Sequence, residues 1–177
     1  MGTERTLFII KPDGYILGPR FREEVRVRIR NAGLKIIQEK ELLLPHDKCA
    51  RHYQKDEAWY LKYGTQILED RKARRLELTR TAIGYGKEIV EKIVAFMTSG
   101  TCILMVIEGE DAIQIVRKLV GTTDPHFARI ETIRHDFSSD SFAQSIHEGR
   151  VIHNLVHCSD GIDSAKFEIE LWSEEML

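Results

Sequence analysis

The stretch Cys102-Ile103-Leu104-Met105-Val106-Ile107 decides the fold. Six consecutive apolar residues fit a central strand that is buried on both faces of a sheet. Just before this strand, apolar side chains recur at helical spacing. They are Ile89, Val90, Ile93, Val94 and Met97. Thr98-Ser99-Gly100 ends that helix, so a helix leads directly into the central strand.

The sequence after the central strand predicts a turn and a further helix. Glu108-Gly109-Glu110-Asp111 has the composition of a turn and offers Asp111 as an N-cap. Ala112 to Val120 then carries apolar side chains at helical spacing, and Gly121 closes the helix. Arg117 lies in its last turn, where the helix dipole favours a cation.

The N-terminal part of the chain predicts two strands and two helices. Residues 6–11 form a compact β-branched and aromatic run, read as a buried first strand that ends at the turn Lys11-Pro12-Asp13-Gly14. Residues 21–32 have the spacing of an amphipathic helix, residues 34–44 that of a second strand, and residues 46–53 that of a short helix. Lys11 is therefore expected at a strand end, where its charged head can reach a cleft.

The C-terminal part supplies the last strand and the last helix. Val151, Ile152, Leu155 and Val156 indicate a short buried strand, and residues 162–172 follow as a helix. The resulting order of elements fits an α+β fold of the ferredoxin-like βαββαβ type. We expect a four-stranded antiparallel sheet with helices on one face. No linker divides residues 1–177, so they are expected to form a single domain.

Composition sets broad limits on function. The 177 residues are 42% hydrophobic and 31% charged, with a net charge of −2, so no basic field is available to attract nucleic acid or an anionic membrane. Cys49, Cys102 and Cys158 show no paired spacing, which favours a reducing compartment. The first residues are polar and charged, and no apolar run is long enough to span a bilayer. A cytoplasmic protein is the resulting expectation.

The stretch Asn154-Leu155-Val156-His157-Cys158-Ser159-Asp160 carries the candidate chemistry. A neutral imidazole can form a covalent intermediate, so His157 is a candidate nucleophile. Glu168 lies eleven positions beyond His157, on the predicted last helix. If that helix folds back over the strand, its carboxylate can accept a proton from the second ring nitrogen and fix the tautomer.

Two other interpretations of His157 stay open at this point. A single histidine near a strand end is more often a structural residue than a nucleophile. His153 and His157 are four apart, which on a helix would suit a metal ion, but the pattern HExxH is missing. On a strand, positions four apart face the same side about 13 Å from each other.

Four segments of the chain resemble the nucleoside diphosphate kinase family. Asn154 to Asp160 is similar to that family's active-site signature, Asn-x-x-His-x-Ser-Asp. The other three segments occur in the family's order; they are Glu4 to Gly14, Gly121-Thr122-Thr123-Asp124-Pro125 and Thr132-Ile133-Arg134-His135-Asp136-Phe137. The resemblance covers most of the chain and also implies the ferredoxin-like fold.

The resemblance implies a role for individual residues. It makes His157 the phosphoryl carrier, with Glu168 behind it and with Ser159 and Tyr53 orienting it. It places the following residues on nucleotide phosphate and sugar: Lys11, Arg117, Thr123, Arg134 and Asn154. Neither GxxxxGK[ST] nor GxGxxG occurs, so scattered side chains would have to hold the phosphates. An arginine can hold two phosphate oxygens at once.

The implied activity is phosphoryl transfer. A nucleoside triphosphate such as ATP or GTP would give its γ-phosphoryl group to His157, and a second nucleoside diphosphate would take it, in a ping-pong cycle. Mg²⁺ is the expected cofactor, carried by the nucleotide phosphates without protein ligands. The resemblance also implies a homo-oligomer (a dimer, tetramer or hexamer). A catalytically reduced nucleotide-binding regulator is the alternative, and a nucleic-acid-binding regulator is a third hypothesis without a basic patch to support it.

The chain departs from the family pattern in several places. Residues 54–88 and 138–149 are insertions, and the first is expected to contain helical structure of its own. Ile89 stands where the family stacks an aromatic ring on the base, and Trp59 is an alternative, so the base contact stays open. Glu131 and His135 stand where the family has glycine, which predicts a changed loop backbone. Cys158 follows the nucleophile, which predicts sensitivity to thiol reagents.

Overall fold

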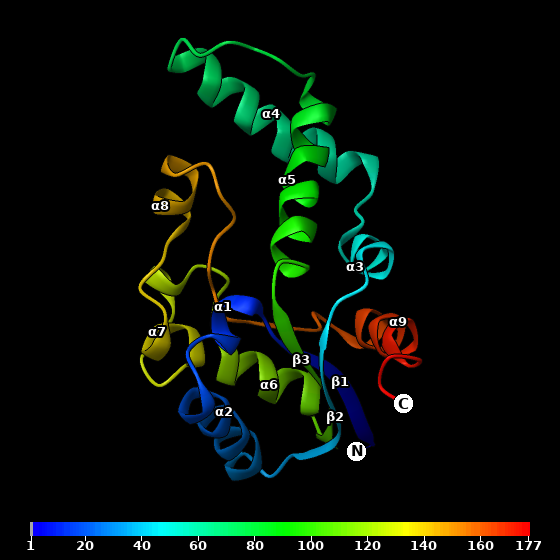
Figure 1. Cartoon of the computed structure of the whole chain (residues 1–177). Coiled ribbons are helices and arrows are strands. Elements are labelled where there is room, and N and C mark those ends of the chain that lie inside the picture. Colours follow the sequence, from blue (N-terminus) through cyan, green and yellow to red (C-terminus); the bar gives the residue numbers. More distant parts are fainter. Residues whose placement is uncertain (1) are drawn as a thin grey trace.

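The structure is a computed structural model that describes residues 2–177. Its centre is an antiparallel four-stranded sheet in the order β2-β3-β1-β4 (Figure 1). The strands are β1 (Thr3–Ile10), β2 (Lys35–Leu43), β3 (Thr101–Glu110) and β4 (Val156–Cys158). This arrangement confirms the predicted α+β, ferredoxin-like fold.

Nine α-helices and one 3₁₀ helix surround the sheet in the described part of the chain. They are α1 (Pro12–Tyr15), α2 (Pro19–Asn31), α3 (His46–Tyr53), α4 (Glu57–Ala73), α5 (Ala82–Met97), α6 (Ala112–Val120), η1 (Pro125–Phe127), α7 (Ile133–Phe137), α8 (Phe142–His147) and α9 (Ile162–Trp172). Within residues 2–177, no helix is long and apolar enough to cross a membrane.

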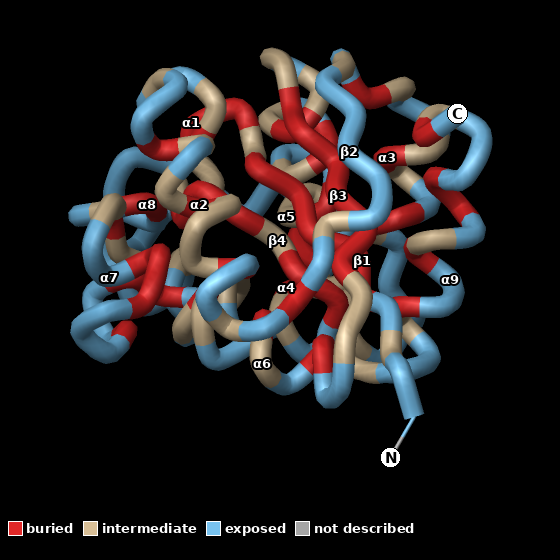
Figure 2. Tube along the Cα trace, turned by 90° about the horizontal axis from the view of Figure 1, so that it is seen from below, coloured by how far each residue is buried: buried red, intermediate tan, exposed pale blue. Residues whose placement is uncertain are grey.

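Helices cover both faces of the sheet, so the expectation of one covered face is wrong. Phe8 and Ile10 of β1 pack into one core with α2 and α6, whereas Leu7 and Ile9 pack into a second core with α3, α5 and α9. Alternate residues of a strand point to opposite faces, and here both sets are apolar and buried. Figure 2 shows β1 and β3 as buried along most of their length.

The register of β4 decides which way the candidate nucleophile faces. His157 pairs with Ile9 and Cys158 pairs with Phe8. Directly opposed residues of antiparallel strands lie on the same face of the sheet. His157 therefore lies on the side of α3 and α9, whereas the Cys158 side chain is buried in the core on the other side.

Three local predictions are corrected by the structure. The last strand does not begin at Val151 but at Val156, because Leu155 adopts a left-handed backbone with φ +69°. The stretch 108–110 belongs to β3 and is not a turn. Asp111 makes no side-chain cap on α6. Instead, the carboxylate of Glu4 accepts the N–H of Ile113 in the first turn of that helix at 3.3 Å. The stretch after Lys11 is one turn of helix, α1.

The insertion 54–88 forms α4 and the start of α5, as predicted for helical structure of its own. Glycines allow the two helices to touch. A Cβ atom on Gly86 would lie 2.1 Å from the Tyr60 carbonyl oxygen, and one on Gly64 would lie 1.6 Å from the Ala82 carbonyl oxygen. Backbone contact at these two points holds α4 against α5 above the sheet (Figure 1).

The insertion 138–149 contains α8 and an ion pair that fixes its base. Arg150 donates to both oxygens of Asp140 at 2.5 and 3.0 Å, and Asp140 accepts the His153 N–H at 2.7 Å. Burial opposes ionisation of Asp140, but these donors lower its pKa to about 2. The charged pair thus anchors the segment that leads into Asn154.

Glu131 and His135 do not change the loop backbone in the way the sequence suggested. Glu131 adopts φ +69°, so it takes the left-handed conformation that glycine would take. His135 lies inside α7, where a right-handed backbone suits any residue. The conformation at Glu131 costs about 1 kcal/mol.

We predict that Gly86→Ala separates α4 from α5 and lowers the free energy of unfolding by about 2 kcal/mol. The added methyl group would have to displace backbone rather than a flexible side chain. Urea denaturation measures the loss. Lys87→Ala is the matched control, because Lys87 is exposed on the same helix. Equal midpoints for the two variants would contradict the close packing of the hairpin.

Candidate active site

The candidate site centres on a hydrogen-bonded pair, His157 and Glu168. The structure brings the two together across the turn between β4 and α9: His157 Nε2 lies 3.1 Å from Glu168 Oε2. The same oxygen accepts a hydrogen bond from the Ser159 hydroxyl at 2.7 Å. Over residues 2–177, no hydrogen bond reaches His157 Nδ1. A carboxylate on Nε2 therefore leaves the Nδ1 lone pair free to act.

Glu168 is suited to accept both hydrogen bonds because it stays ionised. Burial opposes its charge, but the hydrogen bond from His157 and the nearby histidines lower the pKa of Glu168 overall. Ser159 is fully buried and is itself anchored to β1, since its hydroxyl oxygen accepts the Leu7 N–H at 3.1 Å. The carboxylate is thus tied to the sheet through Ser159.

A second group of predicted residues meets at the C-terminal end of β1. Lys11 Nζ donates to Asn154 Oδ1 at 2.6 Å, and Asn154 Nδ2 donates to the Thr123 carbonyl at 2.7 Å. Burial and, to a lesser extent, the positive charge of Arg134 lower the pKa of Lys11 to about 8. The side chain of Thr123 is exposed, so its hydroxyl is open to a ligand. The structure thus brings Lys11, Thr123 and Asn154 into one network.

Arg134 is buried and holds the backbone around the site. Its guanidinium donates to the carbonyls of Gly121, Asn154 and Val156 at 3.0, 3.3 and 2.8 Å. Burial lowers its pKa, but an arginine remains charged at cellular pH. Arg117 differs, because it is half-exposed and pairs with Asp160 at 2.5 Å.

Tyr53 lies beside His157 with a ring separation of 6.0 Å. Its hydroxyl is buried and has no hydrogen-bond partner in the described chain. Burial raises the pKa of Tyr53 well above its ordinary value, so the hydroxyl stays a neutral donor. An unpartnered buried hydroxyl beside the imidazole is available to a group bound there.

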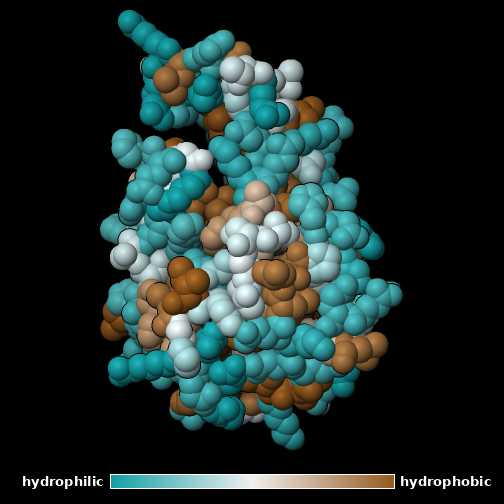
Figure 3. All heavy atoms as spheres, viewed as in Figure 1, coloured by the Kyte–Doolittle hydropathy of each residue, from teal (hydrophilic) through white to brown (hydrophobic). Residues whose placement is uncertain are grey.

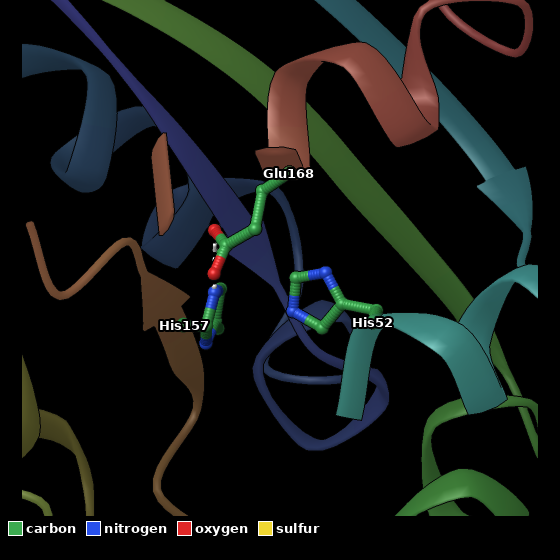
Figure 4. Close-up of side chains that lie close together, drawn as sticks. All are labelled: His52, His157 and Glu168. Atoms are coloured by element: carbon green, nitrogen blue, oxygen red, sulfur yellow. Dashed lines mark hydrogen bonds and ion pairs between the residues drawn. The ribbon is translucent and has the colours of Figure 1, made fainter. Parts of the chain in front are cut away.

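Three residues near the site were not identified from the sequence. His52 lies next to His157 with ring centroids 4.7 Å apart (Figure 4). Asp13 accepts the Leu155 N–H at 2.9 Å, while its other oxygen is buried without a partner in residues 2–177. Arg150 anchors the approach to Asn154. Asp13 and His52 sat inside predicted turn and helix segments, and no local pattern marks such long-range contacts.

The surface is hollowed between α8 and the α4–α5 hairpin (Figure 3). Phe96 of α5 stacks on His153 at 4.9 Å and 19°, which joins the two sides. Trp59 packs against the rings of Tyr60 and Tyr63 and against the core of α3, α5 and α9. Ile89 is half-buried on α5. Trp59 and Ile89 both stay predictions for the base contact.

In residues 2–177, the possible metal ligands include His157 but not His153. His153 stacks on Phe96 and does not pair with His157. Within the part of the chain that is described, the one cluster with metal-ligand spacing is His52, His157 and Glu168, whose ligand atoms lie within 4.8 Å of one another. Two imidazoles suit zinc better than magnesium, which prefers oxygen ligands.

Comparison with known proteins gives a consistent result. The family model for nucleoside diphosphate kinase matches residues 82–176. A nucleoside diphosphate kinase of Pyrobaculum aerophilum is 39% identical over 99% of this chain and 97% of its own length. The nucleoside diphosphate kinase of Pyrococcus furiosus is 31% identical over 96% of this chain and 82% of its own.

Solved structures agree with these sequence relatives. The crystal structure of an NDP kinase from Pyrobaculum aerophilum superposes with a TM-score of 0.87 at 37% identity, covering 99% of this chain and 100% of the other. A transition-state mimic of nucleoside-diphosphate kinase from Borrelia burgdorferi, with bound vanadate and ADP, has a TM-score of 0.75 at 29% identity. It covers 99% and 90% of the two chains.

The structure revises the expected thiol sensitivity, because all three cysteines are buried. Burial raises the pKa of Cys158 to about 11 and of Cys49 and Cys102 to about 12, so little reactive thiolate forms. We now predict that the native protein reacts with Ellman's reagent at pH 7.5 at less than about one thiol per chain in an hour. All three should react in denaturant. Fast labelling of native Cys158 would contradict its burial.

Proposed function

The chain belongs to the nucleoside diphosphate kinase family, and we propose that its cycle is ping-pong through a phosphohistidine on His157. The chain is a phosphotransferase, and the phosphohistidine mechanism is what we propose. One observation supports it most: Glu168 occupies Nε2 of His157 and leaves Nδ1 free. Nothing in the comparisons favours the alternative of a catalytically reduced regulator.

In the first half of the cycle, Nδ1 of His157 attacks the γ-phosphorus of a nucleoside triphosphate such as ATP or GTP. The Nδ1–P bond forms as the P–O bond to the β-phosphate breaks, and its electron pair leaves on the nucleoside diphosphate. The proton on Nε2 stays in the hydrogen bond to Glu168, whose charge stabilises the positive ring. A second nucleoside diphosphate reverses these steps and carries the phosphoryl group away.

We propose that three cations neutralise the spreading negative charge. Lys11 reaches the site from the end of β1, and Arg117 stands half-exposed at the end of α6. Arg134 uses part of its donor set on backbone carbonyls, so we propose that its remaining N–H groups face phosphate. In phosphoryl transfer the protein mainly positions groups and neutralises charge.

Polar side chains are proposed to fix the nucleotide and the transferred group. Asn154 already bridges Lys11 and the loop at Thr123, and we assign it to the sugar hydroxyl. Thr123 would donate its exposed hydroxyl to phosphate. We propose that the unpartnered hydroxyl of Tyr53 donates to the phosphoryl group beside His157. The bound ADP and vanadate in the Borrelia burgdorferi relative support a site of this kind.

We propose that Mg²⁺ enters with the nucleotide phosphates. The cluster at His52, His157 and Glu168 does not fit it, because Mg²⁺ prefers six oxygen ligands. When bound with the nucleotide, Mg²⁺ would supply positive charge to the phosphates. The chain's own cations then complete the neutralisation.

We also propose that the chain forms a homo-oligomer, whether a dimer, tetramer or hexamer. Phe127 and Ile130 on the long loop are 74% and 72% exposed, and Ile16 is 81% exposed. Exposed apolar side chains of this kind are typical of contacts between subunits. Specificity for the base is expected to be broad, because the proposed contacts are to phosphate and sugar.

We predict that His157→Ala takes up no phosphoryl group from γ-labelled ATP and has no transferase activity. Glu168→Ala should still be labelled, but with kcat lower by about 100-fold, because the tautomer is no longer fixed. Peptide mapping locates the label. His147→Ala is the matched control, since His147 is exposed on α8. Stable label on a different residue would rule out the proposed carrier.

We predict that nucleotide affinity weakens above pH 8, the lowered pKa of Lys11. The charge of Lys11 is fully present below that pKa and is lost as pH rises through it. Calorimetry should show ADP binding about tenfold weaker at pH 9 than at pH 7. Lys11→Arg keeps its charge throughout and should lose this dependence. The same weakening in both proteins would assign the effect to another group.

A further inference from the structure

We propose that His52 is a positioning residue that holds a neutral N–H against the His157–Glu168 pair, and that Trp172 fixes the tautomer this requires. The inference rests on the proposed role of His157 as the phosphoryl carrier. It concerns a different residue, contributed by α3, and explains why a buried histidine lies beside the nucleophile.

Trp172 determines which nitrogen of His52 carries the proton. The indole Nε1–H donates to His52 Nδ1 at 3.1 Å, and both side chains are buried. An indole nitrogen can only donate, so Nδ1 must be the unprotonated nitrogen. In a neutral imidazole the single proton is then on Nε2. Trp172 thus fixes the tautomer of His52 as Glu168 fixes that of His157.

The protonated side of His52 faces the reacting pair. The rings of His52 and His157 lie 4.7 Å apart at 73°, and Figure 4 shows the His52 ring directed from α3 toward His157, with Glu168 reaching down from α9. Tyr53 lies next to both rings, 4.6 Å from His52 and 6.0 Å from His157. The His157 ring is therefore held on one side by a ring that cannot itself rotate freely.

His52 adds no charge beside the nucleophile. Burial, and then the neighbouring His157, lower the pKa of His52 to about 3, so it is neutral at cellular pH. A second imidazolium here would oppose the positive charge that His157 gains on phosphorylation. A neutral N–H would face the pair without that repulsion and help to keep Nδ1 of His157 aimed at the proposed phosphate side.

A zinc site is the competing explanation for the same three residues. Two histidines and a glutamate are a known zinc ligand set. A metal at this place would need the lone pair of His52 Nε2, and the Trp172 hydrogen bond places a proton there instead. The ligand atoms are spread over up to 4.8 Å, whereas tetrahedral zinc brings its ligands to about 3.4 Å of each other.

Two substitutions at His52 test the role in catalysis. A glutamine has an oxygen to accept from Trp172 and an N–H to present to the pair, whereas phenylalanine has only the ring. We expect His52→Gln to keep kcat within about fivefold, and His52→Phe to lower kcat about 10- to 100-fold with KM changed less than about twofold. Equal loss in both variants, or full activity in both, would overturn the proposal.

A measurement of the His52 tautomer in the wild-type protein does not depend on whether a variant folds or on turnover. Long-range ¹H–¹⁵N spectra of ¹⁵N-histidine-labelled protein should show His52 with a protonated Nε2 and an unprotonated Nδ1, unchanged when Zn²⁺ is added. A protonated Nδ1, averaged tautomers or a Zn²⁺-shifted His52 would overturn the proposal. Failure of wild-type phosphorylation would instead count against the proposed carrier, because this spectrum does not depend on it.

Discussion

The carboxylate of Glu168 is the constraint on which the rest of the site depends. One of its oxygens accepts from both the His157 ring and the Ser159 hydroxyl. Ser159 is in turn bonded to the backbone of β1, so a single charge joins the last helix, the edge strand and the central sheet. Because the carboxylate is buried, its hydrogen bonds are stronger than they would be in water. It holds the ring and, in the proposed cycle, compensates the charge that the ring gains on phosphorylation.

The part of the site around Lys11 and Asn154 is built from backbone geometry as much as from side chains. Leu155 takes a left-handed conformation, and its N–H is held by Asp13 while its carbonyl accepts from the Lys11 N–H at 2.9 Å. Gly14 is required beneath it, because a Cβ there would lie 2.5 Å from the Leu155 carbonyl oxygen. This pairing brings Lys11 and Asn154 together. Arg134 braces the same segment through carbonyls on either side of Leu155.

Local periodicity predicted most elements of the fold, and the predictions that were wrong have physical causes. Apolar runs and helical spacing located β1, β3, α6 and α9, because core burial imposes those patterns. The apolar run at residues 102–107 indicated burial on both faces, but the order of the elements does not show which helix covers which face, and the expectation of helices on one face was wrong. The predicted start of β4 was wrong because the residue type of Leu155 gives no sign of its positive φ. Glu131 similarly takes a glycine-like conformation that its residue type disfavours.

The site could be predicted where one segment contains the chemistry, and not where distant segments meet. His157 and Glu168 share a strand–turn–helix unit, and the family resemblance located Lys11, Asn154 and the arginines. His52 and Trp172 are 120 positions apart, and only the folded chain joins them.

The most direct test of the account is to identify which imidazole nitrogen bears the phosphoryl group. ³¹P–¹⁵N correlation on ¹⁵N-histidine-labelled protein, phosphorylated with ATP, reports it for His157. We expect phosphorus coupled to Nδ1, with Nε2 protonated and facing Glu168. Phosphorus on Nε2 would contradict it, because that nitrogen would then have left the carboxylate that organises the site.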